Sequence, residues 1–235
     1  MKAPRDARVL EVFERDAAAF VAERLEALQG EGRGVSLGLS GGSTPGPIMS
    51  LLARPAYGRR VDWARVDFFW SDERCVPPDH PDSNYGLAKR LLLDPLGIAP
   101  DRAHRVEGEL TPEEGARRYC AVLQRLAPRG LDLLLLGVGN DGHTASLFPG
   151  SAVLTDFARP AAPAASPAGQ PRVTLTFAAI SEAREVVVLA CGAEKAGVVR
   201  SCLEEKPAPP AGQARGREKT VWLLDAAAAS RLTPR

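Results

Sequence analysis

Short apolar runs alternate with amphipathic segments along most of the chain. Residues 35–39, 66–70 and 131–136 are predominantly apolar, as strands covered on both faces are. Residues 16–28 instead carry apolar side chains at helical spacing, which predicts a helix. The same patterns predict further strands at 9–13, 172–177, 185–191 and 221–224, and a helix at 193–203.

Capping residues indicate where three other helices begin. Pro45 can open a helix at its first position, directly after a glycine loop. Ser83 can cap a second helix, and Thr111 with Glu114 has the spacing of a capping box at the start of a third.

This alternation predicts an α/β fold with a mostly parallel sheet and helices on both faces, in a single domain that spans residues 1–235. Residues 159–171 are dense in Ala and Pro, and we interpret them as a surface loop because strands resume beyond them. In such sheets ligands bind beyond the carboxyl ends of the strands. We therefore expect four loops to be neighbours, namely those after Leu39, Trp70, Leu136 and Cys191.

Composition narrows the range of partners. Thirty Lys and Arg residues balance 29 Asp and Glu residues, and the net charge of +1 gives no general field for nucleic acid or an anionic membrane. The four cysteines and three histidines are scattered, so we expect reduced thiols, no bound metal and no cofactor. The N-terminus lacks the apolar core of a signal peptide and no run approaches transmembrane length, which favours a cytoplasmic protein.

The loop Ser40-Gly41-Gly42-Ser43-Thr44 has the composition of a phosphate cradle. Its glycines let backbone amides approach a ligand, and the helix that follows directs the positive end of its dipole at the same point. No Gly-Lys-Ser/Thr follows, which counts against nucleotide triphosphates. The alternative is a tight strand-to-helix turn that binds nothing.

Charged residues follow the strand at 66–70. Arg74 can clamp a phosphate or stabilise an oxyanion, and Asp72 and Asn84 are candidates for substrate binding. The alternative is a structural salt bridge within the triplet Asp72-Glu73-Arg74, with Asn84 serving only in a turn or helix cap.

Residues 137–142 read Gly-Val-Gly-Asn-Asp-Gly and match the dinucleotide fingerprint G-x-G-x-x-G. We reject that interpretation because a Rossmann fingerprint opens a long helix, whereas Pro149 and Gly150 interrupt this segment almost at once. The Ala/Pro-rich segment then occupies the position where the next strand and its acid would lie.

His143 follows these glycines and is the candidate general base. Imidazole is the side chain that exchanges protons near neutral pH, and Asp141 lies two residues away. A lone histidine can also be merely structural. No G-x-S-x-G elbow occurs and no cysteine stands beside a histidine, so water is the expected nucleophile.

Lys195 lies in the first turn of the helix predicted at 193–203. From there its ammonium group can reach a phosphate as a point charge. The alternative is a solvated lysine on a helix surface.

Together these loops resemble the 6-phosphogluconolactonase family, through residues 39–45, 70–77 with 83–85, 137–150 and 192–195. The most specific stretch is 137–150, Gly-Val-Gly-Asn-Asp-Gly-His-Thr-Ala-Ser-Leu-Phe-Pro-Gly. That family belongs with the glucosamine-6-phosphate deaminases and ribose-5-phosphate isomerases. The resemblance therefore implies a Rossmann-like three-layer α/β/α fold without bound nucleotide, and a sugar phosphate lactone as the small-molecule partner in the oxidative pentose phosphate pathway.

The resemblance also implies roles for individual residues. His143 would activate water, Arg74 would support the reacting end or the phosphate, and Asp141 would orient or tune His143. The phosphate would be bound by Ser43, Thr44 and Lys195.

Three other functions stay open at this point. A deaminase or isomerase shares the fold and the phosphate loop, but deaminases resemble a pattern with Asn-Glu-Pro soon after the histidine, where this chain has Ser146-Leu147-Phe148-Pro149. A non-catalytic sugar-phosphate sensor needs no His143, and no helix-turn-helix or basic arm is attached. A nicotinamide dehydrogenase would bind dinucleotide tightly. The sequence predicts no oligomeric state.

Overall fold

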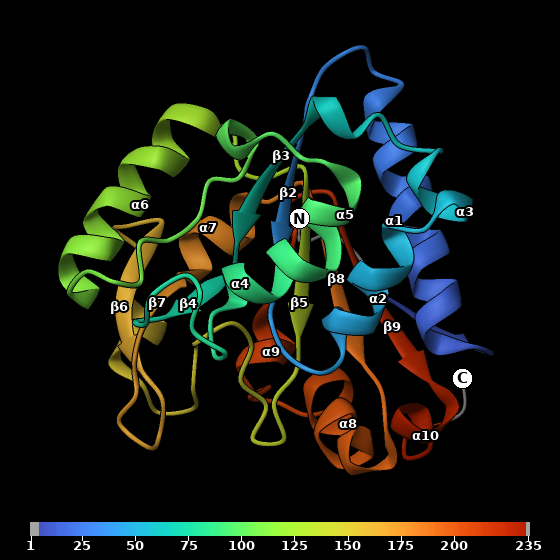
Figure 1. Ribbon diagram of the computed structural model, residues 1–235. Coiled ribbons are helices and arrows are strands. Elements are labelled where there is room, and N and C mark those ends of the chain that lie inside the picture. The colour runs from blue at the N-terminus through green and yellow to red at the C-terminus, as the bar shows by residue number, and fades with distance from the viewer. Residues whose placement is uncertain (1–4, 234–235) are drawn as a thin grey trace.

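Six parallel strands form the central sheet in the order β1-β9-β8-β5-β2-β3 (Figure 1). The computed structural model describes residues 5–233. The expectation that the N-terminus lacks a signal peptide rests partly on residues 1–4, which lie outside the described residues, as do residues 234–235. The mostly parallel sheet that the sequence predicts is confirmed. Its strands are β1 (Arg5–Leu10), β2 (Val35–Leu39), β3 (Val66–Trp70), β5 (Leu133–Gly137), β8 (Glu185–Ala190) and β9 (Lys219–Asp225).

Helices cover both faces of this sheet and complete the three-layer α/β/α arrangement (Figure 1). The helices are α1 (Phe13–Gln29), α2 (Pro45–Leu52), α3 (Pro55–Gly58), α4 (Asn84–Ala88), α5 (Asp94–Leu96), α6 (Pro112–Leu126), α7 (Phe177–Glu182), α8 (Ala196–Glu204), α9 (Pro210–Gln213) and α10 (Ala226–Ala229). Short turns of other helix types are η1 (Trp63–Arg65), η2 (Lys89–Leu93), η3 (Pro100–Arg102), η4 (Ala152–Thr155) and η5 (Ala193–Lys195). No helix within residues 5–233 is both long and apolar enough to cross a membrane.

Successive side chains of each strand point to opposite faces, so the sheet separates two hydrophobic clusters. Phe68 and Leu133 pack in the cluster that includes α1 and α2. Their neighbours Phe69 and Leu134 pack in the other, with α6, α7 and α8. This burial on both faces explains why the strand sequences are apolar throughout rather than alternating.

A second, antiparallel sheet of three strands corrects the sequence prediction. We expected loops at 71–82 and 159–171, but these segments contain β4 (Asp72–Arg74) and β6 (Ala161–Ala165), which pair on either side of β7 (Pro171–Leu175). Pro163 is tolerated in β6 because that strand lies at the edge of the sheet. Figure 1 shows the small sheet beside α6, whose residues contact β6 and β7.

Element boundaries agree with the sequence in most places. The strands at 35–39 and 66–70, the helix that begins at Pro45 and the helix that follows Thr111 are confirmed. The prediction of a first strand at 9–13 is wrong. The strand β1 spans Arg5–Leu10, and α1 already begins at Phe13. Thr111 caps α6 by accepting a hydrogen bond from the Glu114 amide, but the Glu114 carboxylate binds Arg117 and Arg118 instead of closing the capping box.

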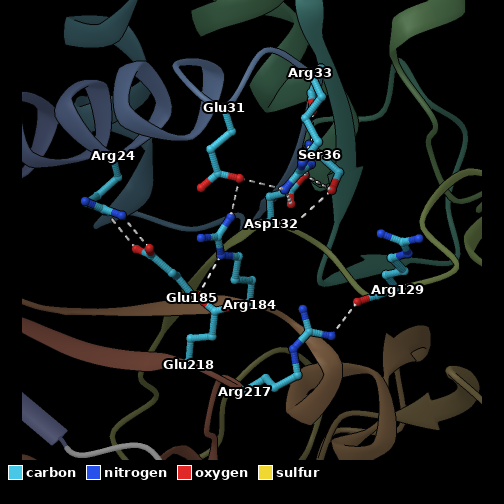
Figure 2. Close-up of polar contacts among 11 residues, drawn as sticks. Arg24, Glu31, Arg33, Ser36, Arg129, Asp132, Arg184, Glu185, Arg217 and Glu218 are labelled. Atoms are coloured by element: carbon cyan, nitrogen blue, oxygen red, sulfur yellow. Dashed lines mark hydrogen bonds and ion pairs between the residues drawn. The ribbon is translucent and has the colours of Figure 1, made fainter.

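Ion pairs gather at the amino ends of β2, β5, β8 and β9 (Figure 2). We call this group the amino-edge network. It includes the pairs Arg24–Glu185 and Arg33–Asp132, and Arg184, which contacts two glutamates. The carboxyl ends of the same strands, at the opposite edge of the sheet, carry the candidate site.

Candidate active site

A cavity of about 160 Å³ opens beyond the carboxyl ends of β2, β3 and β5. The expected meeting of the four loops is confirmed, since each contributes to its wall. Of the predicted site residues, Asp141 alone is absent from the lining, and it contacts His143 instead. The lining residues are Ser40, Gly41, Gly42, Ser43, Thr44, Pro45, Asp72, Arg74, Asn84, Gly137, Val138, Gly139, His143, Ala145, Arg172 and Lys195.

The glycine loop after β2 holds one wall of the cavity close to Asn84. A β-carbon on Gly41 would lie 1.8 Å from Oδ1 of Asn84, so only glycine allows this contact. Gly42 adopts φ +102°, a conformation that side-chain-bearing residues rarely accept. The Ser40 hydroxyl bonds to Ser71 at 2.7 Å and to a backbone carbonyl at 3.0 Å, so its role in the fold is to anchor the loop.

Asp72 is buried, lines the cavity and joins three segments of the chain. Its Oδ2 accepts a 2.6 Å hydrogen bond from the Ser146 hydroxyl, which ties the small sheet to the loop after β5. Its Oδ1 accepts from Asn84 Nδ2 at 3.2 Å. The carboxylate therefore positions both Ser146 and Asn84 around the cavity.

Glu73 points away from the cavity and organises the start of α4. Its carboxylate accepts hydrogen bonds from the backbone amides of Asn84 and Tyr85 at 2.7 and 2.8 Å and from the Ser83 hydroxyl at 3.0 Å. Burial raises the pKa of Glu73, and the hydrogen bonds from backbone amides oppose the rise. A salt bridge within the charge triplet is absent from the described residues, because Arg74 donates to the Asp82 carbonyl at 2.8 Å.

Arg74 and Arg172 face each other across the small sheet, where they are register partners in β4 and β7. Both line the cavity, and the Nε atom of each is buried without a hydrogen-bond partner. Burial, reinforced by the neighbouring Arg74 cation, lowers the pKa of Arg172. Sequence reasoning missed Arg172 because it belongs to a strand, and only the antiparallel pairing brings it to the site.

His143 forms a pair with Asp141 at the side of the cavity. The imidazole Nδ1 lies 2.5 Å from Asp141 Oδ1, which also accepts the His143 backbone amide at 3.1 Å. Burial raises the pKa of Asp141, but the bonds to His143 outweigh it and hold the pKa below its ordinary value. An ionised carboxylate is only an acceptor, so Nδ1 is the donor in this bond, and the neutral tautomer that the bond favours has its lone pair on Nε2.

The loop that carries His143 contains backbone strain. Ala145 has φ +48°, and among residues 5–233 it is the one non-glycine residue in the left-handed region. Hydrogen bonds on both sides hold it there: the Thr144 hydroxyl donates to the Gly137 carbonyl at 2.8 Å, and the Ser146 amide donates to Thr174 at 3.0 Å. Strain of this kind persists where surrounding contacts fix the backbone, as they do in many active sites.

Lys195, in η5, also lines the cavity. Its ammonium group donates to Asn140 Oδ1 at 2.5 Å. Ser43 and Thr44 line the cavity with it and also share an adjoining hollow with Lys195 and Asn140. A cation and two hydroxyl side chains thus meet near the amino end of α2, a setting that suits a phosphate.

Comparison with known proteins assigns the family. A family model described as glucosamine-6-phosphate isomerases/6-phosphogluconolactonase matches residues 10–222. The chain belongs to this family. Within it, the 6-phosphogluconolactonase of Haemophilus influenzae is 36% identical over 83% of this chain and 86% of that protein. The 6-phosphogluconolactonase of Streptomyces coelicolor is 37% identical over 94% of this chain and 91% of its own length.

Solved structures show the same fold for this family member. A crystal structure of 6-phosphogluconolactonase from Thermotoga maritima is 31% identical, with a TM-score of 0.85 and coverage of 94% of this chain and all of that one. The structure of the Trypanosoma brucei 6-phosphogluconolactonase is also 31% identical, with a TM-score of 0.86. That comparison covers 98% of this chain and 100% of that chain. A monomeric glucosamine-6-phosphate deaminase at 22% identity and a TM-score of 0.81 shares the fold.

Two details of this family member bear on cofactors. Residues 138–151 contain turns and one isolated bridge but no helix, so the glycine segment does not open the helix that a dinucleotide fingerprint requires. Within residues 5–233, no group of three or more His, Cys, Asp or Glu side chains is arranged to hold a metal ion.

Proposed function

We propose that the chain hydrolyses 6-phospho-D-glucono-1,5-lactone to 6-phosphogluconate, a step of the oxidative pentose phosphate pathway. The observation that carries the proposal is the His143–Asp141 pair, whose imidazole lines the same cavity as Lys195, Ser43 and Thr44. A base and a phosphate-binding group in one cavity match a phosphorylated lactone. The relatives named 6-phosphogluconolactonase support the same assignment.

Binding of the phosphate positions the substrate. Lys195, with Ser43 and Thr44, holds the phosphate, and this remote binding energy orients the lactone carbonyl beside the imidazole. Gly41 and Gly42 expose the backbone that borders the sugar phosphate. Asp72 and Asn84, linked to each other, provide polar atoms along the sugar.

His143 then acts as the general base. Asp141 holds the Nδ1 proton, so Nε2 takes a proton from a water molecule as the water oxygen attacks the lactone carbonyl carbon. Negative charge develops on the carbonyl oxygen, and Arg74 stabilises it. The bond from the carbonyl carbon to the ring oxygen breaks, and His143 returns its proton to that oxygen. One water is consumed, and the acid formed loses a proton to solvent.

A deaminase would need a further acid–base group near the histidine. The stretch after His143 reads Ser146-Leu147-Phe148-Pro149 and lacks the glutamate of the deaminase pattern. Phe148 instead packs its ring 4.4 Å from the imidazole, centroid to centroid. The hydrolase assignment therefore accounts better for the residues that surround His143.

The decisive experiment measures hydrolysis of freshly generated 6-phosphoglucono-δ-lactone, corrected for spontaneous opening. We expect strong acceleration, and a much smaller effect on the unphosphorylated lactone because Lys195 then has no anion to bind. Ammonia release from glucosamine 6-phosphate and binding of a nicotinamide dinucleotide are measured in parallel. Lactone hydrolysis no faster than the background would refute the proposal and leave a sugar-phosphate sensor as the better assignment.

A further inference from the structure

We propose that Arg172 joins Arg74 in a clamp for the carboxyl end of the substrate, which holds the lactone carbonyl oxygen before ring opening and the product carboxylate afterwards. This inference rests on the proposed lactonase function and adds a binding residue to it. The clamp is distinct from the phosphate end of the cavity at Lys195.

The first support is the pairing of two like charges. Arg74 lies directly opposite Arg172 in antiparallel strands, so both side chains emerge on the same face of the small sheet. Like charges in this relation repel each other and destabilise the strand pair. Asp72 and Thr174, two residues along each strand, share that face and border the same cavity region through Ser146. A bound anion between the two guanidinium groups would remove the repulsion.

The second support is the incomplete pairing of the Arg172 guanidinium. Nη2 donates to Gln170 at 2.9 Å, Nη1 lies 3.6 Å from Asp72 Oδ2, and Nε is buried with no hydrogen-bond partner. The same Asp72 oxygen already accepts the shorter bond from Ser146. Buried charged donors are costly when they are left unpaired, so this arrangement calls for an acceptor that arrives with a ligand.

The third support is the position of Arg172 at the reacting end. The ring of Phe148 packs 4.4 Å from the imidazole of His143, and the Arg172 guanidinium lies 5.9 Å from the centre of the same ring. Arg172 and the proposed base therefore share one wall of the cavity. A carbonyl carbon within reach of a water activated by His143 presents its oxygen toward this wall.

The chemistry at the reacting end uses both guanidinium groups. The carbonyl oxygen gains negative charge when water attacks, and collapse of that intermediate yields a carboxyl group that ionises at neutral pH. Planar guanidinium groups match a carboxylate in geometry as well as charge. We therefore expect Arg172 to contribute to turnover and to the affinity for 6-phosphogluconate.

The test compares two ligands that share a phosphate and differ at the other end. 6-Phosphogluconate carries the carboxylate, whereas glucitol 6-phosphate carries a hydroxymethyl group there. In the Arg172→Met variant we expect the dissociation constant for 6-phosphogluconate to rise about 10- to 100-fold, with that for glucitol 6-phosphate unchanged. In Lys195→Met both should rise together. Calorimetric titration measures the constants of both ligands for the wild type and for each variant.

Matched variants separate a ligand contact from a fold defect. Arg172→Lys keeps the charge and should restore part of the preference for the carboxylate, and Arg105→Met removes a half-buried arginine paired with Glu109 outside the cavity. Equal weakening of both ligands in Arg172→Met, or no weakening of either, would overturn the clamp.

The ligand comparison also stands apart from the lactonase assay. If the lactone assay fails while the carboxylate preference depends on Arg172, the proposed reaction falls and the clamp stands. If hydrolysis is rapid and Arg172→Met keeps the preference, only the clamp falls.

Discussion

The backbone of Gly139 lies directly against the imidazole of His143. A β-carbon on Gly139 would lie 2.1 Å from Nδ1 of that ring and 2.7 Å from Oδ1 of Asp141. Gly139→Ala must therefore displace the His143–Asp141 pair, and we expect kcat to fall about 100-fold, as small misplacements of reacting groups do. Gly197→Ala in α8 is the control, because its β-carbon would meet a neighbour at an ordinary 3.5 Å. Equal activity of the two variants would contradict the prediction.

His143→Ala should lower kcat about 10²- to 10⁴-fold, the range that general bases contribute. The variant should still bind 6-phosphogluconate, since the phosphate end of the cavity is intact. The wild-type rate should fall as the pH drops, because a protonated imidazole cannot accept a proton, and the variant should lack this acid limb. A pH profile of kcat/KM for both proteins decides the matter; an unchanged acid limb in His143→Ala would remove His143 from the mechanism.

Asp141→Asn should reduce kcat about 10- to 100-fold while KM changes little. The amide keeps the shape of the carboxylate but no longer accepts from Nδ1 with a full charge, so the imidazole loses both its preferred tautomer and its stabilised cation. The depressed pKa of Asp141 keeps its carboxylate ionised throughout the neutral range. Titration of Asp141 should therefore produce no inflection in the pH profile of kcat near neutral pH. A variant as active as the wild type would reduce Asp141 to a loop contact.

Lys195→Met should act mainly on substrate binding. Loss of a charge-assisted contact to the phosphate is expected to raise KM about 10-fold or more. The unphosphorylated lactone should be hydrolysed equally by both proteins, because it offers Lys195 nothing to bind. Initial rates over a range of both lactones test this, and an unaltered KM for the phosphorylated lactone would make Lys195 a surface residue.

Asp132→Asn should destabilise the fold without affecting turnover. The Asp132 carboxylate accepts bonds from Arg33 at 2.5 and 2.9 Å and from the Ser36 amide at 2.9 Å. Loss of a buried acceptor of this kind costs about 1–3 kcal/mol of unfolding free energy at neutral pH. Glu26→Gln, which breaks an exposed pair with Arg60, is the control and should change stability little.

The destabilisation by Asp132→Asn should depend on pH. Burial raises the pKa of Asp132, but the bonds from Arg33 and Ser36 outweigh it and lower the folded-state pKa. Its contribution is therefore complete above the unfolded carboxyl value of about 4 and is lost as the pH falls through the lower folded value. Urea unfolding of wild type and variant should give a difference that shrinks on acidification; a difference independent of pH would contradict this.

The sequence predicted the parts of the fold in which local pattern and tertiary setting agree. The strands at 35–39 and 66–70 are apolar because both of their faces are buried, and α6 begins directly after Thr111 because the Thr111 hydroxyl caps the first turn. The meeting of the four loops followed from a general property of parallel sheets. Polar residues after the strands could then be assigned to one cavity without knowledge of their contacts.

The small antiparallel sheet could not be predicted in the same way. The segment Asp72–Arg74 is fully charged and Ala161–Ala165 is alanine around a proline, so neither has the β-branched or aromatic residues typical of strands. Long-range pairing with β7 makes both of them strands, and β6 also packs on α6. Because that pairing was missed, so was Arg172. An isolated arginine at the start of a short apolar run gives no sign that it lies opposite Arg74.

The ion pairs of the amino-edge network lie far from the candidate site, at the opposite ends of the strands (Figure 2). The pair Arg24–Glu185 joins α1 to the start of β8, and the pair Arg33–Asp132 joins the segments that lead into β2 and β5. The candidate cavity lies at the opposite ends of β2 and β5. We expect substitutions at the amino edge to change heat tolerance and to leave the lining of the cavity unaltered. Protein engineering for a hotter process would begin there, and selection for a different sugar acid would begin at the opposite edge.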